Sequence, residues 1–196
     1  EGEGAGKLAL CPTPRLALGD SQVEIEVLAT GLNFKDVLFT TGLLRQQPGE
    51  APLQLGLECA GRITRVGKNV TEFAPGEDVM AVLNGGFVQY ARVESDCVVR
   101  KPAHCRIEQA AALPIAYLTA YYALVVRANL QPGERVLIHS AAGGVGLAAL
   151  HIAKRCGAQI FATAGSEQKR DYLLSLGVHA VADSHDEQFA ATLLTA

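Results

Sequence analysis

The fold is decided by Arg135-Val136-Leu137-Ile138-His139-Ser140-Ala141-Ala142-Gly143-Gly144-Val145-Gly146, in the second half of this 196-residue chain. Its first five residues have the pattern of a fully buried strand of a parallel sheet. A glycine-rich turn follows, and the helical pattern after it runs to Cys156. Pyrophosphate binding needs this layout, because glycines let the main chain approach the phosphates while the helix N-terminus supplies free N–H groups and a favourable dipole.

The glycine pattern alone is a weak signal, and Ala141 stands where its first glycine would be. The flanking strand and helix make the interpretation much stronger. The residues expected to bind the diphosphate of a dinucleotide are Ala142, Gly143, Gly144, Val145 and Gly146. The alternative is a tight strand-to-helix turn that binds no ligand.

The sequence around this motif alternates strands and helices. Strands are predicted at Ile160–Thr163 and Ala180–Ala182, with a helix at Glu167–Leu176 between them. Such β-α-β-α alternation favours a parallel sheet. Upstream, the helical pattern of Tyr117–Ala128 is separated from an earlier one by a break at Pro114.

The first half of the chain is predicted to be mostly strands. Val23–Val27 alternates apolar and acidic residues, which predicts a half-buried strand with one face to solvent. Glu58–Val66 and Phe87–Val93 are further strand candidates, and Asn33–Thr41 has helical spacing with Gly42 as its stop. Many short strands separated by Gly/Pro turns predict a partly open β-barrel. We place the boundary between the two halves near residue 115.

Composition excludes several classes of partner. The formal net charge of −3 gives no electrostatic reason to expect nucleic acid or an anionic membrane. The five cysteines are scattered and never form a C-x-x-C pair, which favours a reducing compartment, the cytoplasm, over a disulfide framework. The opening residues Glu1–Lys7 lack the pattern of a signal peptide. The long uncharged stretch Ala110–Val126 falls short of the ~20 apolar residues of a membrane span.

The end of the second strand bears on the choice of cofactor. NAD sites usually place Asp or Glu there, to bond the ribose 2′-hydroxyl. Here the strand ends in Thr163-Ala164-Gly165-Ser166, and Glu167-Gln168-Lys169-Arg170 follows. Gly165, Ser166 and Lys169 are therefore candidates to hold a 2′-phosphate, which favours NADPH, because a hydroxyl and a cation suit a dianion. The alternative is that Ser166 is an N-cap and Lys169-Arg170 a solvated face.

Four phrases, in collinear order over nearly the whole chain, carry a family resemblance. They are Gly31-Leu32-Asn33-Phe34-Lys35-Asp36-Val37-Leu38, Gly56-Leu57-Glu58-Cys59-Ala60-Gly61, the run LPIAYLTAYYAL at Leu113–Leu124, and Val136–Gly146. The chain thereby resembles the medium-chain dehydrogenase/reductase superfamily, and within it the enoyl reductase domain of modular type I polyketide synthases. The resemblance implies a partial GroES-like β domain over residues 1–115 and the N-terminal half of a doubly wound Rossmann NADPH-binding domain over residues 116–196.

The resemblance also indicates the branch without metal. Zinc members of the superfamily carry a cysteine-containing phrase where Asn33–Asp36 stands, and Gly-His-Glu where Gly56-Leu57-Glu58 stands. Leu57 cannot bind a metal, and no cysteine lies between residues 12 and 58. A catalytic zinc site needs three protein ligands. The chain is therefore similar to the zinc-independent, quinone-oxidoreductase-like members.

For these members the resemblance implies reduction of a conjugated carbon–carbon double bond. The expected substrate is a trans-2-enoyl thioester on the phosphopantetheine arm of an acyl carrier protein, beside neighbouring synthase domains. NADPH hydride goes to the β-carbon and a proton to the α-carbon. Asn33 and Thr119 are carried over as contacts to the nicotinamide–ribose end of the cofactor. The alternatives are a helix N-cap for Asn33 and a buried hydroxyl bonded to its own helix for Thr119.

No catalytic residue is assigned. The resemblance places the family's usual candidate acids, a lysine and an aspartate, beyond position 196. Leu44 stands at the position where many polyketide enoyl reductases carry a tyrosine that is associated with protonation on one face of the α-carbon. We therefore expect an incomplete Rossmann domain, without activity by itself and with an uncovered sheet edge. Two other functions stay open: a free-standing zinc-independent quinone or enone oxidoreductase, and a non-catalytic nucleotide-binding module. The oligomeric state is not assigned.

Overall fold

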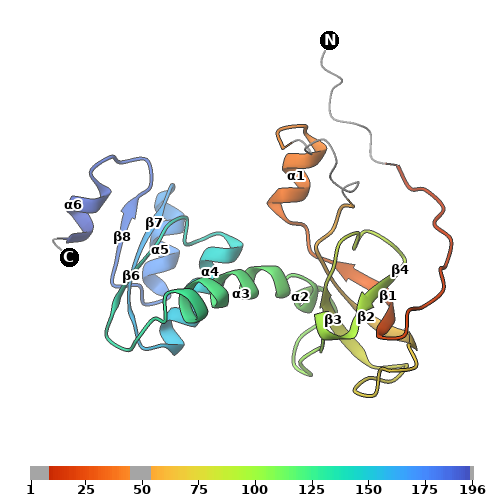
Figure 1. The fold of residues 1–196 in the computed structure, drawn as a ribbon. Helices are drawn as coiled ribbons and strands as arrows, with labels where there is room; N and C mark the ends of the chain where they lie inside the picture. Colours follow the sequence, from red (N-terminus) through yellow and green to blue (C-terminus); the bar gives the residue numbers. More distant parts are fainter. Residues whose placement is uncertain (1–8, 45–53, 195–196) are drawn as a thin grey trace, which may run out of the picture. The chain divides into compact units, whose positions relative to one another are not determined.

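The computed structural model describes residues 9–44 and 54–194 (Figure 1). The chain divides into two compact units, Glu1–Ile115 and Ala116–Ala196. Each unit has a hydrophobic core of its own, one built on antiparallel strands and the other on parallel strands.

The first unit is a curled antiparallel sheet in the order β4-β1-β2-β3-β5 (Figure 1). Its strands are β1 (Gln22–Thr30), β2 (Glu58–Val66), β3 (Asp78–Val82), β4 (Tyr90–Glu94) and β5 (Val98–Arg100). Alternate residues of these strands, among them Ile25, Ile63 and Val79, meet inside the curl as the core. The predicted partly open barrel is thus confirmed.

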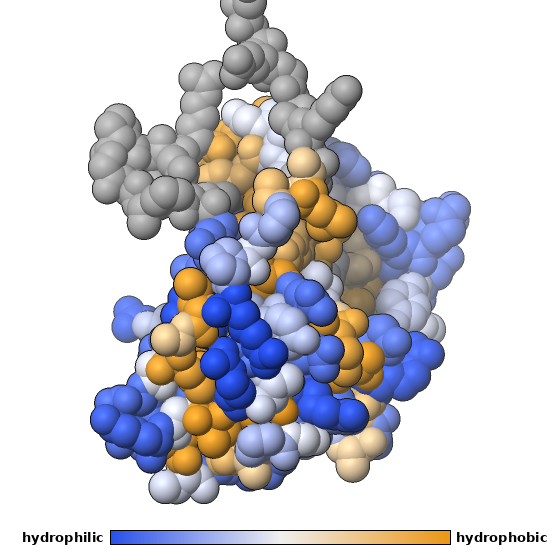
Figure 2. Space-filling model, turned by 90° about the vertical axis from the view of Figure 1, so that its right-hand side faces the viewer, coloured by the Kyte–Doolittle hydropathy of each residue, from blue (hydrophilic) through white to orange (hydrophobic). Residues whose placement is uncertain are grey.

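The face of the molecule drawn in Figure 2 is chemically mixed. Figure 2 shows hydrophilic and hydrophobic side chains interspersed over the face that it presents. The apolar side chains there form several separate groups among polar ones, so that face has no single apolar surface.

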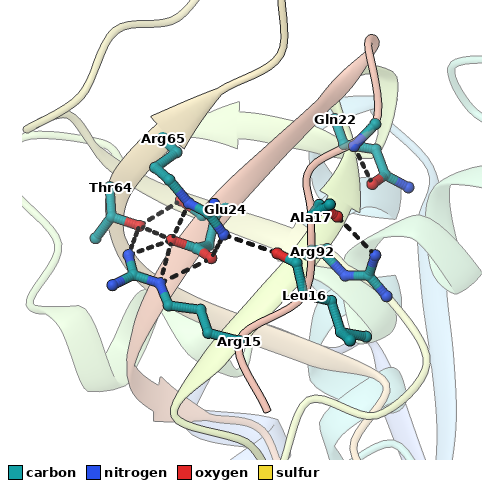
Figure 3. Close-up of polar contacts among 9 residues, drawn as sticks. Arg15, Leu16, Ala17, Gln22, Glu24, Thr64, Arg65 and Arg92 are labelled. Carbon is teal, nitrogen blue, oxygen red and sulfur yellow. Dashed lines mark hydrogen bonds and ion pairs between the residues drawn. The ribbon is translucent and has the colours of Figure 1, made fainter.

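The prediction that one face of β1 meets solvent is wrong at Glu24. This side chain has no exposed surface, because Arg15 and Arg65 lie over its carboxylate (Figure 3). Thr64 donates to the same carboxylate, with 2.6 Å between Oγ1 and Oε1. The alternation of residues predicted the strand correctly, but cations from other segments cover the acidic face.

The helices of the first unit are short. They are α1 (Phe34–Thr40), the 3-10 turn η1 (Ser95–Cys97) and α2 (Ile107–Ala111). Gly42 follows α1 with a φ of +72°, a left-handed conformation that ends helices and favours glycine. Pro114 opens α3 (Pro114–Tyr121), at the helix position where its missing N–H costs nothing, and η2 (Tyr122–Arg127) continues it as a π-helix.

The second unit is built on a parallel sheet in the order β6-β7-β8, as predicted. Its strands are β6 (Arg135–Ile138), β7 (Gln159–Ala164) and β8 (Ala180–Asp183), and its helices are α4 (Gly144–Arg155), α5 (Glu167–Ser175) and α6 (Phe189–Leu194). Ile160 and Ala162 of β7 join the main core with residues of α4 and α5. Phe161, on the opposite face of β7, packs with Phe189 and Leu193 of α6.

The prediction that the first parallel strand is fully buried is wrong. Ile138 is buried, but Leu137 retains 41% of its surface. In the described part of the chain β6 pairs with β7 alone, so its other edge has no strand. Burial of a parallel strand depends on neighbours at both edges and on both faces.

No helix in the described ranges is both long enough and apolar enough to cross a membrane. The five cysteines, all of which lie in those ranges, are free thiols.

Candidate nucleotide site

The glycine-rich turn lies between the end of β6 and the start of α4. Ser140 begins it with a φ of +51°, which is uncommon outside glycine. The fully buried Thr163 of β7 holds the turn from the neighbouring strand. Its carbonyl accepts from Ala141 N–H at 3.1 Å, and its hydroxyl oxygen accepts from Ser140 N–H at 3.3 Å. The second strand therefore fixes where the turn lies.

The residues of the turn differ in how much space is available for a side chain at each position. A Cβ on Gly146 would lie 2.6 Å from Ala141 Cα and from the Ser140 carbonyl oxygen, so this helix–strand contact requires glycine. A Cβ on Gly144 would meet no protein atom within 4 Å. Ala141 is fully buried, and its methyl group belongs to the core. Alanine at the first glycine position of the motif therefore adds its methyl group to the core and does not fill the turn.

The start of α4 has the donors that an anion needs. Gly143 is the N-cap and makes no side-chain capping bond. The first helical bond runs from Leu147 N–H to the Gly143 carbonyl at 2.8 Å. The N–H groups before Leu147 thus have no capping side chain, and Gly144 and Val145 are exposed. This is the arrangement that binds phosphate groups at helix N-termini.

At the end of β7, the two interpretations of Ser166 are compatible. Ser166 is the N-cap of α5, and its Oγ accepts from Lys169 N–H at 3.4 Å. The hydroxyl proton stays free to be donated, because a serine hydroxyl both donates and accepts. The Lys169 side chain is exposed. Gly165 is exposed, and a Cβ there would lie 2.6 Å from Cε1 of the His185 side chain.

Arg170 is less available to a ligand than Lys169. Its Nη1 donates to the Ala164 carbonyl at 3.2 Å and forms an ion pair with Asp183 at 2.8 Å. The backbone N–H of His185 donates to Asp183 at 2.9 Å and is the first of several contacts that lower the pKa of that carboxyl group. The acid at the end of β8 is thus already paired with a cation.

In the first unit, Asn33 occupies the N-cap position of α1, but its side chain makes no capping hydrogen bond. Its Nδ2 instead donates to Glu58 Oε1 at 2.9 Å. Glu58 Oε2 accepts from Ile115 N–H at 2.8 Å, and the side chain is only 3% exposed. Sequence reasoning missed this use of Glu58. The available signal was an acidic residue at the start of a strand of small and β-branched residues.

Thr119 lies on α3 in the second unit with an exposed side chain, so the interpretation as a buried hydroxyl is wrong. Leu44 follows Gly42 after α1 and is 39% exposed.

The residues present do not fit a zinc ion. Glu58 is committed to Asn33 and Ile115, and Leu57 has no donor atom. Cys59 is fully buried, and burial raises the pKa of its thiol to about 12, which opposes the thiolate form that zinc requires. Over residues 9–44 and 54–194, no three His, Cys, Asp or Glu side chains are grouped so that they could hold a metal ion.

Comparison with known protein families gives two matches. Residues 19–103 match the alcohol dehydrogenase GroES-like domain, and residues 144–196 match the family described as zinc-binding dehydrogenase. In this chain the second description fits the fold but not a metal site.

Individual relatives agree with these matches. The chain is 46% identical over 175 residues to polyketide synthase GfsB of Streptomyces halstedii, which covers 88% of this chain and 3% of that protein. Highly-reducing polyketide synthase 1 of Aureobasidium melanogenum is 46% identical over 157 residues, covering 80% of this chain and 7% of the relative.

Solved structures agree as well. The CurK enoyl reductase superposes with a TM-score of 0.89 at 42% identity, covering 94% of this chain and 58% of that one. The Escherichia coli quinone oxidoreductase complexed with NADPH gives 0.77 at 32% identity, with 90% and 54% covered. The chain thus spans less than a tenth of these curated relatives and little more than half of these structures. It belongs to the medium-chain dehydrogenase/reductase superfamily, in which it is similar to the enoyl reductases of polyketide synthases.

Proposed function

We propose that this chain is part of an NADPH-dependent enoyl reductase that reduces trans-2-enoyl thioesters carried on an acyl carrier protein during polyketide chain extension. The observation that carries the proposal is the turn before α4. Gly146 there admits no side chain, Gly144 faces open space, and the helix start has no capping side chain. The similarity to polyketide synthases and to the CurK enoyl reductase supports the substrate class.

The proposed reaction adds a hydride to the β-carbon and a proton to the α-carbon of the enoyl thioester. Bound NADPH would supply the hydride. The residues proposed to bind the diphosphate are Ala142, Gly143, Gly144, Val145 and Gly146. Those proposed near the 2′-phosphate are Gly165, Ser166 and Lys169, and those at the nicotinamide–ribose end are Asn33 and Thr119. The proton donor is not assigned to any residue of this chain.

Selectivity for NADPH over NADH tests the cofactor. In fluorescence titrations of the full-length protein, NADPH is expected to bind about tenfold or more tightly than NADH, because Ser166 and Lys169 can both donate to a 2′-phosphate. Lys169→Gln is expected to weaken NADPH binding and leave NADH binding unchanged. The control is Arg155→Gln, which removes a cation at the far end of the twelve-residue α4. Equal affinity of the wild type for both cofactors would remove the argument for NADPH.

Substrate preference separates the remaining functions. With NADPH, the full-length protein is expected to reduce a pantetheine- or carrier-bound crotonyl thioester with a kcat/KM about tenfold or more above that for a quinone. The reverse preference would indicate a quinone or enone oxidoreductase. Tight NADPH binding with no turnover of either compound would indicate a non-catalytic nucleotide-binding module.

We also propose neighbouring synthase domains as partners and the cytoplasm as the location. The relatives are far longer than this chain, and the five free cysteines suit a reducing compartment. Further strands would complete the nucleotide domain beside β6, whose outer edge is unpaired in the described part of the chain.

A further inference from the structure

The buried carboxylate of Glu58 contacts Asn33, and it belongs neither to the glycine-rich turn nor to the residues proposed near the 2′-phosphate. We infer that Glu58 is a positioning residue, which fixes the Asn33 amide so that its carbonyl oxygen, and not its NH2 group, is offered to the cofactor. The inference rests on the proposed role of Asn33 at the nicotinamide–ribose end, and it adds a hydrogen-bond polarity to that role.

Both oxygens of the Glu58 carboxylate are engaged. Oε1 lies 2.9 Å from Asn33 Nδ2, and Oε2 lies 2.8 Å from the backbone nitrogen of Ile115. A carboxylate only accepts hydrogen bonds, so the group of Asn33 that faces it must be the NH2 group. The amide oxygen of Asn33 therefore points to the other side of the amide plane.

The surroundings hold this arrangement in place. A Cβ on Gly31 would lie 2.3 Å from Glu58 Oε1, so glycine at position 31 leaves space for the Glu58 carboxylate. The backbone of Asn33 is held separately, because Asp36 Oδ2 accepts from its N–H at 2.9 Å. The N–H of Asp36 donates to the Asn33 backbone carbonyl, also at 2.9 Å. The Asn33 amide is thus half-buried with one defined orientation.

This polarity selects what Asn33 can bind. An amide oxygen accepts, so it suits a ribose hydroxyl or a carboxamide N–H. It does not suit a phosphate oxygen, and the negative charge of Glu58 behind it also disfavours an anion. The polarity of the amide therefore suits the proposed place of Asn33 at the neutral sugar–nicotinamide part of a dinucleotide, and it does not suit a place at the phosphates.

The test exchanges the polarity of the pair in the full-length protein. In Glu58→Gln the new amide oxygen must face Ile115 N–H, which can only donate, so the new NH2 group faces Asn33 and turns its amide over. The KM for NADPH is expected to rise about tenfold with kcat changed less than about twofold, because the lost contact is one that the cofactor makes equally in the ground state and in the transition state. Asn33→Asp in the Glu58→Gln background replaces the Asn33 amide by a carboxylate, which offers one acceptor oxygen to the new NH2 group at position 58 and another to the cofactor. The KM for NADPH is then expected to return to within about threefold of the wild type.

Asp36→Asn provides the structural comparison. Asp36 is a buried carboxylate that accepts from the backbone N–H groups of Asn33 and Gly56. It is not bonded to the side-chain amide of Asn33, which donates to Glu58. Its loss is expected to lower the melting temperature, and adding Asn33→Asp should not relieve that loss. An unchanged KM for NADPH in Glu58→Gln, or a raised KM that Asn33→Asp fails to restore, would overturn the inference. Failure of the wild type to use NADPH would instead overturn the proposed function.

Discussion

Replacing Glu24 by glutamine is expected to lower the free energy of unfolding by about 3 kcal/mol at pH 7, near the low end of the range for breaking a buried ion pair. The Glu24 carboxylate accepts from Arg15 Nε at 3.0 Å and from Arg65 Nε at 2.9 Å, and it is fully buried (Figure 3). An amide would place its own N–H groups against two guanidinium groups. Both arginines keep about 40% or more of their side-chain surface, so water relieves part of the cost. Urea denaturation followed by circular dichroism measures the change.

Asp20→Asn is the matched control for this variant. Asp20 forms an ion pair with Lys68 at 2.8 Å, and both side chains are more than half exposed. Exposed pairs of this kind contribute about 0–1 kcal/mol, so the control is expected to change stability little. If Glu24→Gln were no more destabilising than Asp20→Asn, the carboxylate would not be holding Arg15 and the segment around it against the sheet.

The pH dependence of the same variant has a defined sign. Hydrogen bonds from Arg65 and then Arg15 hold the pKa of Glu24 well below its usual value. A depressed pKa in the folded state gives stability that is present above the unfolded pKa of about 4.3 and is lost as the pH falls towards the folded value. The stability difference between the wild type and Glu24→Gln should therefore be constant near neutrality and shrink below about pH 4. A difference that grew on acidification would contradict this account.

Glu24 also shows where sequence reasoning stops. Alternating residues correctly predicted the strand, because the direction of a side chain in a strand is a local property. What covers each face is not local: Arg15 comes from the segment before β1 and Arg65 from β2. The bond between Asn33 and Glu58 joins residues 25 positions apart, so the phrase around Asn33 could not reveal its orientation. The exposure of Leu137 likewise depends on strand neighbours and not on its own pattern.

The glycine turn was predictable for the opposite reason, since its chemistry lies within a few residues of chain. Only the structure, however, separates the roles of its glycines. Gly146 is required by the protein itself, whereas no protein atom lies close enough to Gly144 to require glycine there. The two positions therefore allow the fold and the nucleotide site to be tested independently.

Gly144→Ala is expected to keep the melting temperature of the wild type and to weaken NADPH binding by about tenfold or more, because the new methyl group meets no protein atom within 4 Å but occupies the approach to the helix start. Gly146→Ala is expected to lower the melting temperature by about 5 °C or more and to abolish measurable binding, since its Cβ would lie 2.6 Å from backbone atoms. Differential scanning fluorimetry and NADPH fluorescence titration of both variants measure the two effects. If Gly144→Ala bound NADPH as tightly as the wild type, the space before α4 would not be where the diphosphate lies, and the turn would be only a connection between strand and helix.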